Sequence, residues 1–139
     1  MKQLILIITI AFFSTQSFAQ GDGSGRVRAM RVNFITEKMH LPPDQNAKFW
    51  SVYTRYMDER SALRKTYLKQ FMSNKNENLT KYQAYRRVDD NIEYKEKDLQ
   101  LSKKYRDELL QVISPQQLVE LYDAERDFKK MLIEKLKDK

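Results

Sequence analysis

Residues 43–74 read PDQNAKFWSVYTRYMDERSALRKTYLKQFMSN, and this stretch decides the fold. It contains no glycine, and its one proline stands at the first position, where a missing N–H costs a helix nothing. Apolar residues recur at three- and four-residue steps, which is the period of a helix with one apolar face. They are Phe49, Tyr53, Tyr56, Leu63, Tyr67 and Phe71. The stretch is predicted to form one helix of about 32 residues, ~48 Å long.

The sequence on both sides of this stretch also favours helices. No glycine follows Gly25, and breaks occur only at 41–45, 79–83 and 113–117. The last two breaks have the form of capping boxes, in which Thr80 pairs with Gln83 and Ser114 with Gln117. Four helices are therefore predicted, at 26–41, 43–74, 81–113 and 115–137. The third carries an apolar stripe of Tyr85, Val88, Ile92, Leu99, Leu109 and Ile113.

The predicted fold class is all-α, with four helices, two of them long, in one thin, elongated domain spanning residues 26–139. A helix of ~48 Å exceeds the diameter of a compact domain of this size, so the ratio of core to surface is poor. Thin helical proteins recover burial by self-association, and we therefore expect a homodimer. The chain has no cysteine, so neither disulfides nor thiolate metal sites contribute.

The first nineteen residues have the layout of a secretory signal peptide. Met1-Lys2 gives a positive start, residues 4–13 form an apolar run, and Ser17 and Ala19 place small residues before the cleavage point. The apolar run is too short to span a bilayer. Residues 1–19 are therefore predicted to be removed during export, and residues 20–25, with their glycines, to form a flexible leader.

Charge is uneven along the chain. Residues 26–75 contain 11 basic and 4 acidic residues, whereas residues 76–139 contain 14 of each. This pattern has two interpretations, which the sequence leaves open. The cations either serve solubility alone or form a surface that attracts acidic partners or anionic lipid.

Several function classes are disfavoured by the residues present. His40 is the only histidine, and it has no Gly-rich oxyanion loop near it in sequence, so an enzyme is not expected. Acidic pairs such as Asp89-Asp90 stand among Lys and Arg, as on a solvated helix face. The predicted export argues against nucleic acid as a partner. No cofactor is expected. Met39 and His40 form the one cluster suited to a soft metal, and they are kept as a weak alternative metal site.

The breaks at Leu41-Pro-Pro-Asp-Gln45 and Ile113-Ser-Pro-Gln-Gln117 resemble the paired LTxxQ motifs of the Spy/CpxP family. The matching positions are Leu41, Gln45 and Gln117, with Ile113 in place of Leu and Ser114 in place of Thr. The first motif departs from the pattern by having proline in the Thr position. The literal match at 79–83 falls where the family has no motif, and we interpret it as a helix cap.

The resemblance implies a cradle-shaped periplasmic dimer in which the motif residues are structural. It also implies one of two roles. The first is an ATP-independent chaperone that binds unfolded or stress-damaged envelope proteins. The alternative is an envelope-stress or heavy-metal sensor that acts on a membrane-bound signalling partner. For the first role, cationic and adaptable apolar side chains of the basic half are the candidate client-binding residues. They are Arg28, Met30, Arg31, Phe34, Arg55 and Arg60.

Overall fold

A computed structural model describes residues 23–73 and 78–137 of the chain. It confirms the all-α prediction, with four helices in these ranges: α1 (Gly23–Met39), α2 (Pro43–Ser73), α3 (Lys81–Leu109) and α4 (Pro115–Lys137). The predicted signal peptide and the first residues of the predicted leader lie outside the described residues. Within the two described ranges, no helix combines the length and apolar character needed to cross a membrane.

Three helix boundaries differ from the sequence prediction. Helix α1 includes Gly23 to Gly25, which were predicted as leader, and it ends at Met39 because His40 has a positive φ of 44°. A residue in this left-handed conformation cannot continue a right-handed helix. Helix α3 ends at Leu109, four residues early, because the N–H groups of Gln111 and Val112 bond to carbonyls three residues back, those of Glu108 at 3.3 Å and Leu109 at 2.8 Å, in the tighter pattern of a turn.

The starts of α2, α3 and α4 follow the sequence closely. Thr80 and Gln83 form the predicted capping box, with the Thr80 N–H donating to Gln83 Oε1 at 2.9 Å. Ser114 and Gln117 form the second box, at 2.9 and 3.1 Å. Helix α2 has no hydroxyl cap, and the Pro42 carbonyl accepts its first backbone hydrogen bonds. Both predicted capping boxes are confirmed.

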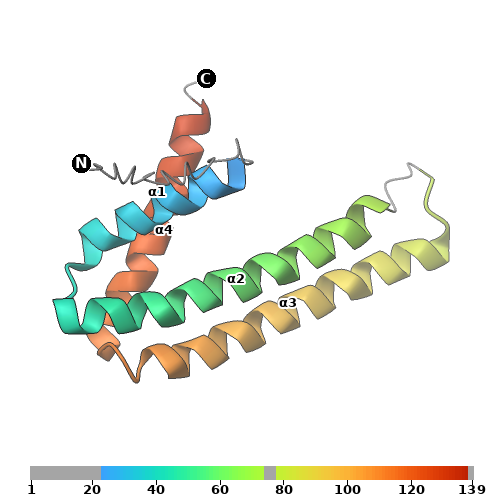
Figure 1. Ribbon diagram of the computed structural model, residues 1–139. Helices are drawn as coiled ribbons and strands as arrows, with labels where there is room; N and C mark the ends of the chain where they lie inside the picture. Colours follow the sequence, from blue (N-terminus) through green and yellow to red (C-terminus); the bar gives the residue numbers. More distant parts are fainter. Residues whose placement is uncertain (1–22, 74–77, 138–139) are drawn as a thin grey trace, which may run out of the picture.

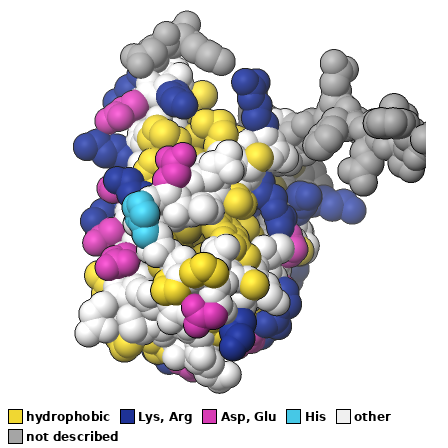
Figure 2. All heavy atoms as spheres, turned by 60° about the vertical axis from the view of Figure 1, so that its left-hand side comes forward, with side chains coloured by type: hydrophobic (Ala, Val, Ile, Leu, Met, Phe, Trp, Pro, Cys, Tyr) yellow, Lys and Arg dark blue, Asp and Glu magenta, His cyan; other side chains and the backbone are white. Residues whose placement is uncertain are grey.

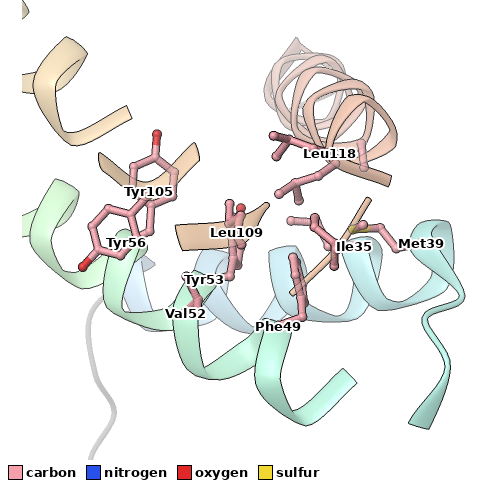
Figure 3. Close-up of a cluster of buried hydrophobic side chains, with 12 residues drawn as sticks. Ile35, Met39, Phe49, Val52, Tyr53, Tyr56, Tyr105, Leu109 and Leu118 are labelled. Atoms are coloured by element: carbon pink, nitrogen blue, oxygen red, sulfur yellow. The ribbon is translucent and has the colours of Figure 1, made fainter. Parts of the chain in front are cut away.

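The helices pack in two pairs: α2 and α3 form a long antiparallel hairpin, and α1 packs across α4 (Figure 1). The α1–α4 pair lies across one end of the long α2–α3 hairpin, and the rest of the hairpin projects beyond it. The core forms where the pairs meet, around Phe49 and Tyr53 of α2, Leu109 of α3, Ile35 of α1 and Leu118 of α4 (Figure 3). This end of the molecule is called the base below.

Candidate functional site

The projecting part of the hairpin has no core of its own. It comprises α2 from Met57 and α3 up to Lys104, and we call it the arm. None of its described residues is buried, whereas the base contains every buried residue of the described ranges. A pair of helices with so little burial gains little from the hydrophobic effect. Polar contacts and partly buried aromatic rings must therefore hold α2 to α3 along the arm.

Hydrogen bonds and stacked rings cross between the two helices of the arm. The Arg60 guanidinium donates twice to the Asp98 carboxylate, at 2.7 and 3.1 Å, which is the strong bidentate geometry. Further out, the Tyr67 and Tyr94 rings stack with centroids 4.5 Å apart. Asn91 donates to the Tyr67 hydroxyl at 2.7 Å. The inward face of α3 in the arm is thus mostly polar, and this fixes the register of the helices.

A second set of polar contacts between α2 and α3 lies where the arm meets the base. Glu59 accepts hydrogen bonds from Lys104 at 3.0 Å and from the Tyr105 hydroxyl at 2.6 Å. The bond from Tyr105, followed by the one from Lys104, lowers the pKa of the Glu59 carboxyl below its ordinary value. One turn earlier on α2, Arg55 donates to Glu108 at 2.9 Å. Glu59 is therefore ionised at neutral pH and holds α3 against α2 where the arm begins.

Four apolar residues of α3 lie uncovered on the arm. They are Tyr85, Val88, Ile92 and Leu99, and each is at least 50% exposed. Their spacing of three, four and seven residues places them on one side of the helix. We call them the arm stripe. The sequence predicts one apolar stripe for α3, and the structure divides it: Leu109 and Ile113 are buried in the base, while these four have no partner helix.

Of the candidate client-binding residues in α1, the two arginines and the phenylalanine already have partners within the chain. Arg28 forms an ion pair with Asp58 of α2, and this hydrogen bond lowers the pKa of the Asp58 carboxyl. The Arg31 guanidinium lies over the Phe128 ring of α4, 5.3 Å from its centroid. Phe34 packs on the same ring at 5.7 Å. Met30 is half-buried. These side chains attach α1 to its neighbours.

The two candidates from α2 are also engaged, because Arg55 pairs with Glu108 and Arg60 with Asp98. The six candidates therefore do not form one free surface, and their role in client binding stays a prediction. The uncovered apolar surface lies elsewhere, on the arm. The sequence does carry a sign of this surface. Arg87, Asn91 and Asp98 recur at a helical spacing, and they occupy the face of α3 that packs on α2, which leaves the apolar face of α3 outside.

The structure brings the two motif glutamines together. Gln117 Nε2 donates to Gln45 Oε1 at 3.0 Å, across 72 residues of sequence. The carbonyl oxygen of the same Gln117 amide accepts from the Ser114 N–H. Ile113 is buried in the core, and Leu41 packs against it as a partly buried residue. The motif residues thus join the starts of α2 and α4, which is a structural role.

Met39 and His40, the alternative metal site, lie at a hollow of about 210 Å³ between α1 and α2. Met39 is buried among its lining, and the His40 ring is exposed on this face of the molecule (Figure 2). Phe49 and Trp50 line the hollow from α2. Nowhere in ranges 23–73 and 78–137 do three or more His, Asp or Glu side chains gather closely enough to hold a metal ion.

No known family model, curated protein or solved structure matches this chain.

Proposed function

We propose that this protein is a periplasmic chaperone of the Spy/CpxP type, which binds unfolded or stress-damaged envelope proteins without ATP. The observation that carries the proposal is the arm stripe, an apolar surface on a helix pair that has no core beneath it. The predicted signal peptide and the paired motifs at 41–45 and 113–117 support the setting and the family. In this proposal the stripe, rather than the paired cations of α1 and α2, contacts the client.

The stripe suits weak binding of many different chains. Each side chain retains half or more of its surface for contact, and burying a large apolar side chain fully contributes about 1.5–3 kcal/mol. Four partial contacts of this kind give binding strong enough to delay aggregation and weak enough for release. Aliphatic and tyrosyl side chains make no demand on the sequence of the bound segment. Neighbouring charges on α3, such as Lys95 and Glu96, keep the surface hydrated when no client is bound.

The proposal includes a homodimer with a cradle-like shape. The arm gains most from a partner, since its apolar residues are uncovered and its interior is polar. The arm stripe can therefore contact either a second copy of the chain or an unfolded client. An experiment distinguishes the two, because only contact with a second copy changes the molecular mass of the purified protein.

The test measures aggregation of an unrelated unfolding protein in the absence of ATP. The variant Val88→Ser/Ile92→Ser removes two apolar side chains from the stripe. The control is Val119→Ser/Ile133→Ser on α4, where the same residue types have matching exposure: 58% against 56% for the valines, and 46% against 50% for the isoleucines. We expect the wild type and the α4 variant to suppress aggregation, and the stripe variant to lose most of the effect.

Sedimentation of the same three proteins identifies the occupant. If the stripe variant remains a dimer and loses suppression, the stripe contacts the client. If it becomes a monomer, the stripe is the interface between copies and the client surface lies elsewhere. Equal suppression by all three proteins, or none by the wild type, contradicts the proposed function.

A further inference from the structure

The end of the arm that lies farthest from the base concentrates positive charge. Residues 61–88 contain seven basic residues and one acidic residue, in a chain whose formal net charge is +7. Within its described parts, 61–73 and 78–88, six basic residues and no acidic residue occur. The remainder of the chain is close to neutral. The positive electrostatic potential of the molecule is therefore centred on the end of the arm.

The cations on α2 at this end are exposed and lack carboxylate partners. Arg64, Lys65 and Lys69 form no ion pair with any residue that the structure describes. This distinguishes them from Arg55 and Arg60, nearer the base on the same helix, which are both paired with α3. Cations that are free of internal partners remain available to an external anion.

Apolar side chains lie among these cations. Leu68 and Met72 are exposed and alternate along α2 with Lys65 and Lys69, so all four lie on the side of the helix away from the Tyr67–Tyr94 stack. We call these four residues, with Arg64, the arm tip. The tip lies near the projecting end of the hairpin (Figure 1), and it places cations beside apolar side chains on one face of α2.

We propose that the arm tip docks on a membrane surface that contains anionic phospholipid. The cations attract the negative surface, and Leu68 and Met72 then enter the boundary between headgroups and acyl chains, where the apolar face of an amphipathic helix is favoured. A bilayer suits a projecting end, because it offers a broad surface and requires no groove in the protein. An acidic protein would account for the cations alone, without the apolar side chains between them.

Docking through the tip would keep the base and the arm stripe away from the bilayer. The part of α2 in the arm has about 17 residues, which separates the base from the end of the hairpin by ~25 Å. The protein would thus be held at the membrane with its stripe accessible. This inference does not depend on the chaperone activity, since the stripe and the tip consist of different residues.

The test measures binding of the full protein to vesicles by flotation. Vesicles of phosphatidylcholine with phosphatidylglycerol should bind it, vesicles of phosphatidylcholine alone should not, and added salt should weaken binding. Each cation near an anionic surface contributes about fivefold in the partition coefficient, so Arg64→Gln/Lys65→Gln/Lys69→Gln should lower it about a hundredfold. The matched control is Lys129→Gln/Lys130→Gln/Lys135→Gln, which removes three exposed cations of α4 that are likewise without ion pairs in the described ranges.

A second measurement does not depend on charge removal. In Met72→Trp, indole emission should shift to shorter wavelength with anionic vesicles, while the native Trp50 in the base provides the unshifted reference. Equal losses from the two charge variants, or no shift in Met72→Trp, would overturn the proposal. So would a wild type that ignores anionic vesicles but binds soluble polyglutamate, which would make the tip a site for acidic polypeptides.

Discussion

Gln117 makes two different contributions through one side chain. Its carbonyl oxygen completes the capping box at the start of α4, and its NH₂ group donates to Gln45 at the start of α2. Gln83 at the start of α3 has the first role alone, on an exposed surface. A comparison of the two glutamines therefore isolates the contribution of the hydrogen bond between helices, which Gln117 makes and Gln83 does not.

We predict that Gln117→Ala destabilises the protein more than Gln83→Ala. Loss of a capping contact costs about 1 kcal/mol. In Gln117→Ala the half-buried Gln45 amide also loses its donor, which adds about 1 kcal/mol. Urea unfolding of both variants measures the difference. A Gln45→Ala/Gln117→Ala double variant serves as the control, and purely additive losses would show that the two amides are not coupled.

Tyr53 shows how one polar atom is accommodated in the core. Its ring is fully buried between Phe49 and Tyr56, and its hydroxyl donates to Glu125 of α4 at 2.6 Å. Burial and the neighbouring carboxylate both raise the pKa of the Tyr53 hydroxyl, so it remains protonated and able to donate. Its periodic position predicts that the ring is buried, but nothing in the sequence indicates a partner 72 residues away.

At the scale of the elements, the sequence predicts those helix boundaries that depend on neighbouring residues alone. The caps Thr80 and Ser114, together with Pro43 at the first helical position, define the starts of three helices, and each predicted start is correct. The end of α3 was placed too late, because the turn at 110–113 contains Leu110 and Val112, which are equally suited to a helix. Its form depends on the approach of α4 to the base, which is a tertiary effect.

The candidate site was less predictable for a related reason. Apolar spacing shows that Val88 and Ile92 share a side of α3, but not whether another helix covers that side. In the structure, α2 packs instead on the polar face that contains Asn91 and Asp98. Pairing of Arg28 and Arg60 with distant carboxylates was equally invisible in sequence, since those partners are 30 and 38 residues away.

The ion pairs at the start of the arm predict a dependence of stability on pH. The pKa of Glu59 is lowered in the folded protein, so its contribution is present above the ordinary value of 4.5 and is lost as pH falls through the lower folded pKa. We expect Tm to be nearly constant down to about pH 5.5 and to fall below about pH 4.5. Thermal melts followed by circular dichroism measure this.

Glu59→Gln isolates the contribution of this carboxylate. The variant should lower Tm by about 2–4 °C at neutral pH, because Lys104 loses its partner, and should approach the wild type in acid. Glu120→Gln is the control, since Glu120 is exposed and forms no ion pair in the described ranges. A constant difference between Glu59→Gln and wild type from neutral to acid pH would contradict the assignment.

At the scale of the whole molecule, stability and exposed surface are divided between two regions. The base holds all the buried residues of the described ranges, from Ile35 to Phe128. The arm holds eight of the thirteen exposed large apolar residues, from Leu68 to Leu99. An isolated helix pair of this kind is stabilised mainly by polar contacts, which are individually weak at a surface. The arm should therefore unfold locally before the base does.

This division leads to the expectation that self-association stabilises the arm in particular. If two copies cover each other's arms, Tm should rise with protein concentration by mass action, and amides of α3 between Tyr85 and Leu99 should exchange more slowly in concentrated samples. Amides of α4 in the base provide the internal control, because their protection should change little. Sedimentation over an about hundredfold range of concentration should show the dimer. A monomer throughout, with constant Tm and constant exchange, would contradict the dimer and would leave the arm stripe open to clients at every concentration.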